Sequence, residues 1–320
     1  MKKIKIVGAI LAAGTLLAAC SGTGSDSGTA DTAKKDYTYA VITHGAPGDA
    51  FWDRVKSGAE QAGKDYGVKV EYSSDADPAK QSQLIDGAVA DKVDGIVVSM
   101  ANPDGLEASV KKAVAAGVPV ITINSGVDKF KDFGAITHIG QTETIAGEAV
   151  GERLKTGGAK NAICVIQEAG NVGLEERCKA VAATMGGTVE NLQVDGTDDN
   201  AVQATITSKL QANKDIDTVV TLGGQYAIDA VGSVEESGSS AKIATFDLSE
   251  DVIKDIQSDK ILFAVDQQPY VQGFLGVTTL YLKDINGNDV GGGQPINSGP
   301  AFITKDNADA VLKFAANGTR

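Results

Sequence analysis

Polar side chains stand at the ends of the hydrophobic runs that we expect to form parallel strands. Loops and helix starts converge beyond the carboxyl ends of such strands, so these residues should meet at one edge of each sheet. The residues at these strand ends are His44, Asn102, Asn124, Ser125, the run Gly223, Gly224 and Gln225, and Asp247, Asp266, Gln267 and Gln268. Arg177 follows a further such loop, and Phe51 and Trp52 lie near His44. Amides, carboxylates and arginine exchange hydrogen bonds with hydroxyl groups, and an aromatic face covers the C–H side of a sugar. The set therefore suits a neutral polyhydroxylated ligand.

The elements that must position these side chains alternate between strand and helix. Short β-branched runs predict strands over 37–43, 68–72, 94–100, 118–124, 162–167, 188–194, 217–223, 242–248 and 261–267. Val55, Ala59, Ala62 and Tyr66 mark one face of a first helix, and further helices are expected at 77–92, 102–117, 141–156, 174–186, 198–213, 225–237 and 249–258. Such alternation indicates an α/β fold with two doubly wound parallel-sheet domains.

Several kinds of chemistry find no support in the residues. The net charge of −13 argues against nucleic acid, because phosphate binding needs clustered basic residues. The two histidines are far apart, no His/Cys cluster has zinc spacing, and no nucleophile elbow, P-loop or dinucleotide fingerprint is present. The acidic run 195–200 lacks the ligand spacing of a calcium loop. We expect no enzymatic activity, no cofactor and no metal.

The amino terminus has the composition of a targeting segment. Residues 1–19 join basic residues to an apolar run too short for a stable membrane span, which indicates a signal peptide. The run ends in "LAAC", which resembles a lipoprotein cleavage site with Cys20 as the lipidated residue; the alternative is an ordinary signal peptide that contains Cys20. Residues 20–36 then form a flexible tether. The mature protein is expected on the extracytoplasmic face of the cell membrane, held by a lipid anchor.

Two cysteines remain once Cys20 is assigned to lipidation. Cys164 lies in a predicted strand, and Cys178 lies in the helix that follows. An even pair in an oxidising compartment favours a disulfide. Two buried free thiols are the alternative.

Six segments, in this order, resemble one known family: "FWDRVKSGAEQAGKDYGVKV", "DPAKQSQLIDGAVADKVDGIVV", "VKKAVAAGVPVITIN", "ERCKAV", "IATFDLS" and "ILFAVDQQPYVQG". The chain is similar to the type I periplasmic sugar-binding proteins that serve ABC importers. The resemblance implies two α/β domains, residues 37–140 with 268–291 and residues 141–267 with 292–320, joined by a three-strand hinge. The chain would cross between them near Gly140, near 266–268 and within 286–295.

The resemblance also assigns roles to individual residues. It implies stacking aromatics at Phe51 and Trp52, a polar pair at Asn124 and Ser125, and ligand contacts from Arg177 and Asp247. Gln267 matches a hinge glutamine that also contacts ligand. Ribose-binding sequences carry Asp-Arg in place of Asn124-Ser125, and Asp49 stands in a longer first loop where Asn is frequent. These departures argue against ribose itself.

Each of these residues also has a structural interpretation that the sequence leaves open. Trp52 could belong to the core, Arg177 could be a surface charge, and Asp247 could cap the helix that opens at Ser249. His44 could be a loop histidine satisfied by local hydrogen bonds or a ligand contact.

We therefore predict a monomeric substrate-binding lipoprotein of an ABC importer. It would capture a sugar or sugar alcohol in a cleft between its domains and deliver that ligand to the membrane permease. The alternative is a receptor of the same fold that recognises a sugar or furanosyl signal and feeds a sensor or chemoreceptor.

Overall fold

The strands fall into two separate sheets. The computed structural model describes residues 36–46 and 48–320, which form one unit, and the predicted signal peptide, tether and Cys20 lie outside these residues. The first sheet has the order β2-β1-β3-β4-β5-β11, and the second has the order β7-β6-β8-β9-β10-β12. Neighbouring strands pair in parallel except for β12, which runs antiparallel to β10. Apart from that edge strand, the predicted doubly wound α/β architecture is present in both halves.

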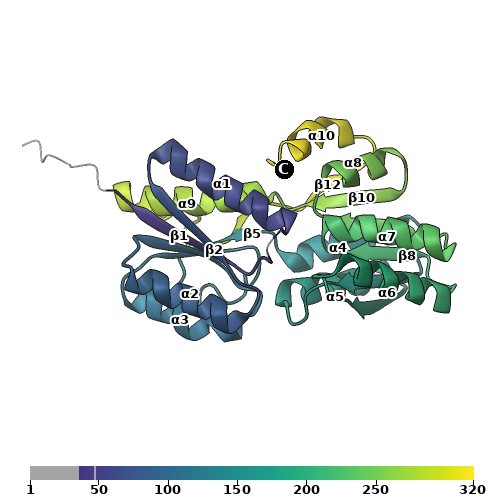
Figure 1. The fold of residues 1–320 in the computed structure, drawn as a ribbon, viewed down its shortest axis with the longest axis horizontal. Coiled ribbons are helices and arrows are strands. Elements are labelled where there is room, and N and C mark those ends of the chain that lie inside the picture. The colour runs from purple at the N-terminus through teal and green to yellow at the C-terminus, as the bar shows by residue number, and fades with distance from the viewer. Residues whose placement is uncertain (1–35, 47) are drawn as a thin grey trace, which may run out of the picture. The chain divides into compact units, whose positions relative to one another are not determined.

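The first sheet is built from the first part of the described chain and from a later segment, residues 269–297. Its strands are β1 (Thr38–Thr43), β2 (Lys69–Ser74), β3 (Gly95–Ser99), β4 (Val120–Ile123), β5 (Thr137–Gly140) and β11 (Ile296–Asn297). Its helices are α1 (Ala50–Tyr66), α2 (Pro78–Ala90), α3 (Pro103–Ala115) and α9 (Pro269–Asn286). Figure 1 shows α9 lying beside α1, although more than 200 residues separate them in the sequence.

The second sheet takes the middle of the chain and its last segment. Its strands are β6 (Asn161–Ile166), β7 (Thr188–Gln193), β8 (Thr218–Thr221), β9 (Lys242–Phe246), β10 (Ile261–Asp266) and β12 (Ala301–Ile303). Its helices are α4 (Glu143–Thr156), α5 (Val172–Met185), α6 (Asp199–Ala212), α7 (Gly224–Ser237), α8 (Glu250–Gln257) and α10 (Ala308–Ala316).

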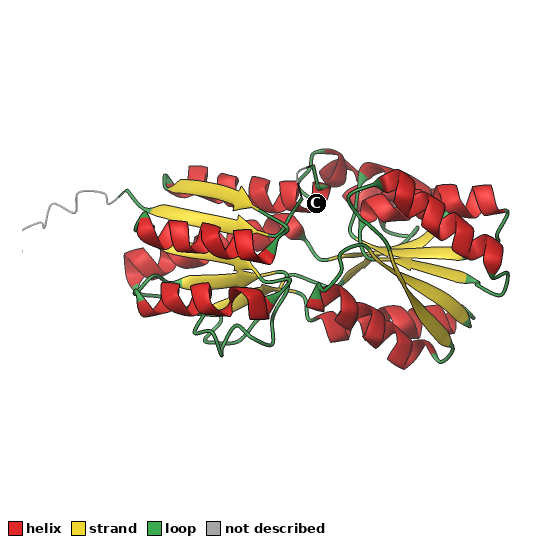
Figure 2. Cartoon of the chain, turned by 60° about the horizontal axis from the view of Figure 1, so that its bottom comes forward, coloured by secondary structure: helices red, strands yellow, loops and turns green. Residues whose placement is uncertain are grey.

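Both faces of each sheet are buried under helices, as Figure 2 shows. Successive strand residues point to opposite faces. On β1, Tyr39 and Val41 pack with α1 and α9, whereas Ala40 and Ile42 pack with α2 and α3. This double burial explains why inner strands such as β3 and β4 appear in the sequence as continuous apolar runs, whereas the edge strands β2 and β7 alternate.

Three chain crossings join the halves, and the last one differs from the prediction. The first two lie between β5 and α4 and between β10 and α9. β11 pairs with β5 of the first sheet, so the third crossing lies at 298–300 and not within 286–295. The first half therefore extends beyond residue 291, the boundary predicted from the sequence. A two-residue strand carries too little pattern to be recognised in advance.

The predicted pair of cysteines forms a disulfide. Cys164 on β6 and Cys178 on α5 are both fully buried, and their sulfur atoms are bonded. The bridge holds α5 against β6, the strand that precedes it in the chain. Closing a loop of this length removes conformational freedom from the unfolded chain, which stabilises a protein by about 3 kcal/mol on the chain-entropy model.

Replacing both cysteines with alanine is therefore expected to lower the free energy of unfolding by about 3 kcal/mol. Alanine is preferred to serine because it leaves no hydroxyl without a partner in the core. Denaturant unfolding of this variant should match that of the wild type under reducing conditions. Equal stability of the variant and the oxidised wild type would show that the bridge does not stabilise the fold.

Candidate functional site

A cavity of about 380 Å³ lies beyond the carboxyl ends of the strands of both sheets. Its wall takes residues from the loops after β1, β4, β6, β8, β9 and β10. Parallel strands bring their carboxyl ends to one edge, so two such edges facing each other create a polar cleft. Every candidate ligand-binding residue lines this cavity except Ser125: the list is His44, Asp49, Phe51, Trp52, Asn124, Arg177, Asp247 and Gln267.

The aromatic wall is set by the start of α1. Asp49 is the N-cap, and its Oδ1 accepts from the backbone N–H groups of Phe51 (2.8 Å) and Trp52 (3.4 Å). This cap satisfies two donors of the first helical turn and fixes where both rings begin. The rings of Phe51 and Trp52 meet edge to face at 4.9 Å.

Trp52 belongs both to the core and to the cavity wall. Its side chain is 7% exposed and packs with Val41 and Val55, yet it also lines the cavity. The two interpretations left open by the sequence are therefore compatible. Truncating Trp52 would also disturb the core, so a loss of binding in Trp52→Ala could not be assigned to the ligand site alone.

His44 connects the first half to the loop after β6. Its backbone N–H and its ring Nδ1 both contact Oγ of Ser99, at 3.0 and 2.7 Å. Its Nε2 lies 3.5 Å from Nδ2 of Asn171 and 3.8 Å from Oε2 of Glu168. Burial lowers the pKa of His44, so the ring is neutral at pH 7. A neutral ring that accepts from Asn171 at Nε2 carries its proton on Nδ1 and donates it to Ser99.

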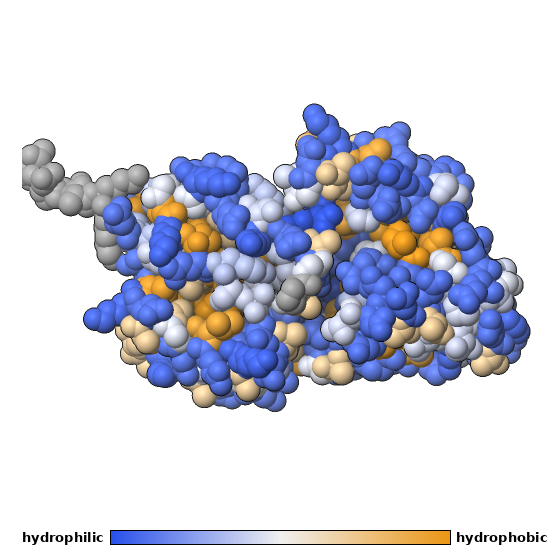
Figure 3. All heavy atoms as spheres, viewed as in Figure 1, coloured by the Kyte–Doolittle hydropathy of each residue, from blue (hydrophilic) through white to orange (hydrophobic). Residues whose placement is uncertain are grey.

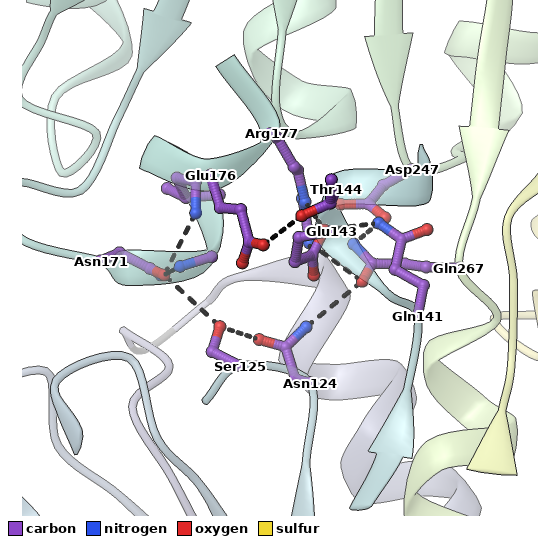
Figure 4. Close-up of polar contacts among 12 residues, drawn as sticks. Asn124, Ser125, Gln141, Glu143, Thr144, Asn171, Glu176, Arg177, Asp247 and Gln267 are labelled. Carbon is purple, nitrogen blue, oxygen red and sulfur yellow. Dashed lines mark hydrogen bonds and ion pairs between the residues drawn. The ribbon is translucent and has the colours of Figure 1, made fainter. Parts of the chain in front are cut away.

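Arg177 is held by a buried carboxylate, as Figure 4 shows. Nε and Nη2 of Arg177 both donate to Glu143, the second at 2.8 Å, and both side chains are 2% exposed. The guanidinium also lies over the ring of Phe246, at 4.8 Å from its centroid. Arg177 is therefore not a surface charge. Among the described residues, Nη1 makes no hydrogen bond, which leaves its two donors for the cavity.

Gln267 joins the two halves at the floor of the cavity. Its Oε1 accepts from Nη2 of Arg177 (3.2 Å) and from Nδ2 of Asn124 (3.3 Å). Its Nε2 donates to Oδ1 of Asp247 (2.8 Å). One amide thus positions three cavity residues, and it sits directly at the crossing from β10 to α9.

Asp247 does not cap the following helix. That role falls to Ser249, whose Oγ accepts from the backbone N–H of Val252 at 3.1 Å. Asp247 instead adopts a left-handed backbone with φ of 69°, a conformation that Asp and Asn tolerate better than most residues. Burial raises its pKa to about 7, against the opposing effects of Arg177 and Gln267. The sequence alternative of a helix cap is therefore wrong, and the carboxyl group is available to the cavity.

Ser125 lies behind the cavity wall. Its Oγ donates to Oδ1 of Asn124 (2.9 Å), and Oδ1 of Asn171 lies 3.4 Å away. It is 2% exposed and is absent from the cavity lining. Ser125 is thus placed to orient Asn124 rather than to reach a ligand.

Part of the cavity wall was not predicted from the sequence. Gln167, Glu168, Asn171, Tyr226 and Asp229 also line the cavity. Asn171 caps α5, accepting from Gly173 and Leu174, and an Asn before a helical run could have indicated that position. Asp229 lies inside α7, where no local signal distinguishes it from a solvent-facing residue.

Two buried acceptor atoms on this wall lack a hydrogen-bond partner within the described part of the chain. They are Oε1 of Gln167 and Oδ2 of Asp229. Buried polar groups are nearly always paired in folded proteins, so these atoms are suited to a ligand that donates hydrogen bonds. Burial raises the pKa of Asp229 to about 6, and the pKa of Asp49 is raised for the same reason.

Within residues 36–46 and 48–320, no group of three or more His, Cys, Asp or Glu side chains is arranged to hold a metal ion. Within the same ranges, every helix is too short or too polar to span a bilayer. In the view of Figure 3, hydrophilic residues dominate the surface, and hydrophobic residues occur in small separate groups.

The chain belongs to the family described as the periplasmic binding protein domain, whose model matches residues 39–287. A carbohydrate transporter from Acidothermus cellulolyticus 11B, solved in complex with myo-inositol, is 45% identical with a TM-score of 0.88, and the match covers 89% of this chain and 99% of that chain. These findings confirm the predicted fold class and family.

Two curated relatives are more distant. The ribose import binding protein RbsB of Haemophilus influenzae is 27% identical over 239 residues, which cover 72% of this chain and 80% of that protein. The xylose/arabinose-binding protein XylF of Sulfolobus acidocaldarius is 25% identical over 267 residues. That match covers 75% of this chain but only 64% of XylF, less than two thirds of its length.

Proposed function

We propose that the protein is an extracytoplasmic solute-binding component of an ABC importer and that it captures a cyclic polyol such as myo-inositol. The observation that carries this proposal is the cavity itself, which is lined by the aromatic pair Phe51 and Trp52, by half-buried carboxylates such as Asp247 and by buried amides such as Asn124. The relative with 45% identity was solved in complex with myo-inositol, which supports the choice of a cyclic polyol over a pentose.

The wall chemistry fits a ring that carries a hydroxyl group on every carbon. Hydroxyl groups can donate to Asp247, to Oε1 of Gln167 and to Oδ2 of Asp229, and they can accept from Nη1 of Arg177. The apolar C–H edge of the ring then lies against Phe51 and Trp52. Once water is excluded, a ligand lacking one hydroxyl leaves a buried partner unpaired, which is the source of specificity.

Domain closure, the monomeric state and the lipid anchor are also part of the proposed function. The two halves act as domains, residues 37–140 with 268–297 and residues 141–267 with 301–320, which close on the ligand and present it to the permease. The protein carries no catalytic step and works as a monomer. Cys20 bears the lipid that anchors the protein to the outer face of the membrane. Several acyl chains together hold a protein firmly on a membrane, whereas a single chain binds only weakly.

A ligand screen tests this function. We expect myo-inositol to raise the melting temperature of residues 37–320 and ribose to raise it less, because a ligand that binds only the folded state stabilises it in proportion to its affinity. Trp52 is the only Trp in the chain, so its fluorescence should change in the same titration. Phe51→Leu, which removes one wall ring and spares Trp52, should weaken myo-inositol binding without loss of fold.

The control is Phe314→Leu, a ring on α10 that is 48% exposed and does not line the cavity. It should bind as the wild type does. The proposal is abandoned if no neutral polyol or sugar in a panel of pentoses, hexoses, inositols and linear polyols shifts the melting temperature.

A further inference from the structure

The start of α5 touches the first half directly, at the edge of the cavity. The backbone N–H of Val172 donates to the carbonyl of Ala101, in the loop after β3, at 3.0 Å. Next to it, Oδ1 of Asn171 lies 3.4 Å from Oγ of Ser125, in the loop after β4. We call Ala101, Ser125, Asn171, Val172 and Gly173 the clasp, because these residues join the two halves at the edge of the cleft.

Gly173 permits this contact. A Cβ atom built on Gly173 would lie 2.9 Å from Oγ of Ser125 and 3.4 Å from Oδ1 of Asn171. The first distance is shorter than real Cβ contacts allow, so any side chain here pushes α5 away from Ser125 or turns the hydroxyl out of place. Gly173 is not among the residues with positive φ, so its backbone does not require glycine. Since glycine in a helix is about 0.5–1 kcal/mol less favourable than alanine, the close approach is the feature that explains it.

The clasp is connected to the cavity through Ser125. Its hydroxyl donates to Oδ1 of Asn124, and Nδ2 of Asn124 donates to Oε1 of Gln267. The same Gln267 oxygen accepts from Arg177, as Figure 4 shows. A shift of α5 against Ser125 therefore disturbs the orientation of Asn124 at the cavity wall, although neither Ser125 nor Gly173 lines the cavity.

We infer that the clasp determines how long the cleft stays closed on its ligand. This inference rests on the proposed function. Contacts made only in the closed form shift the equilibrium toward that form and slow the release of whatever is enclosed. Ser125 and Gly173 are thus positioning residues: they set affinity through the dissociation rate and make no contact with ligand.

Two substitutions at Gly173 test the inference. Gly173→Ala should weaken myo-inositol binding, and Gly173→Val should weaken it by about tenfold or more through faster dissociation, with the association rate nearly unchanged. Ser125→Ala alone should also weaken binding, because it removes the hydroxyl that orients Asn124. In the Ser125→Ala background, Gly173→Ala should cause little further loss, because the nearest atom is gone and Ser125 Cβ lies 3.6 Å from the new methyl group. A purely structural role for Gly173 predicts the same loss from Gly173→Ala in both backgrounds.

The matched control is Gly87→Ala, inside α2, where a Cβ atom meets nothing within 4 Å. It should slightly stabilise the fold and leave affinity unchanged. If Gly173→Val binds and releases myo-inositol at wild-type rates, the clasp has no role in closure.

A second measurement needs no ligand. Val172 is the first residue of α5, so its amide has no partner within the helix, and its acceptor among the described residues is the carbonyl of Ala101. The halves close part of the time even without ligand, so hydrogen exchange at this amide should be slower in the wild type and in Gly87→Ala than in Gly173→Val. Equal exchange in wild type and Gly173→Val would overturn the clasp. A wild type that binds no polyol but shows the exchange difference would overturn only the proposed function.

Discussion

Arg177→Met is expected to lower the free energy of unfolding by about 3–5 kcal/mol and to abolish measurable polyol binding. The substitution leaves the carboxylate of Glu143, which is 2% exposed, buried without its cation. Removing one partner of a buried ion pair has this large effect because the remaining charge cannot return to water. Denaturant unfolding followed by circular dichroism gives the free energy, and calorimetric titration gives the binding.

A second variant separates stability from binding. Arg177→Met combined with Glu143→Gln removes both charges and should recover most of the lost stability, while binding stays absent because Arg177 lines the cavity. As a surface control, Lys254→Met breaks an exposed pair with Glu250 and should change stability little. The buried-pair account fails if Arg177→Met unfolds at the same denaturant concentration as the wild type.

Asp247→Asn is expected to weaken polyol binding by about tenfold to a hundredfold, the effect of losing a hydrogen bond to a charged group. Asparagine is the appropriate replacement because it tolerates the left-handed backbone of this residue, whereas alanine would add strain. Titration calorimetry with myo-inositol at pH 8 measures the difference.

The same residue makes binding depend on pH. Burial raises the pKa of Asp247 to about 7. A ligand hydroxyl donates more strongly to the ionised carboxylate, so affinity should rise as the pH increases through 7. Stability has the opposite sign: between the ordinary pKa of 3.8 and about 7, the unfolded chain releases this proton and the folded chain keeps it, so the free energy of unfolding falls as the pH rises.

The pH dependence of affinity and that of the free energy of unfolding should both be much reduced in Asp247→Asn. Asp229, whose pKa is raised to about 6, also lines the cavity. The control Asp229→Asn removes the part of the pH dependence that this residue contributes. Burial lowers the pKa of His44, which moves its titration away from that of Asp247. An affinity that is the same at pH 5.5 and pH 8.5 in the wild type would contradict a role for the Asp247 carboxylate.

The sequence predicted the architecture well because each strand and helix carried its own local signal. The β-branched runs and the Asn or Asp caps of α2 and α3 depend only on residues close together in the chain. The helix over 174–186 was expected two residues late, because the cap at Asn171 was overlooked. Five elements were not assigned: β5, α9, β11, β12 and α10. The strands among them are only two to four residues long, which leaves too little pattern to recognise.

Interactions between residues far apart in the sequence were harder to predict than the residues that line the cavity. Strand-end polar residues such as Asn124 and Asp247 could be chosen because parallel strands bring their carboxyl ends together. The partner of Arg177, Glu143, could not be predicted because it lies on another helix. Nothing in the local sequence distinguishes a buried glutamate from the many exposed ones. Asp229 was missed for the same reason, since only the packing of α7 turns it toward the cavity.

The three crossings have a consequence for the order in which the chain can fold during its synthesis. α9 contributes Val277 and Leu280 to the core that α1 shares with β1, and β11 closes the edge of the same sheet. These segments are made only after the strands β6 to β10 of the second sheet have been made. The half that is begun first is therefore completed late. Until α9 has emerged, the apolar face that α1 shares with it lacks its cover, and a chaperone has its longest opportunity to bind there.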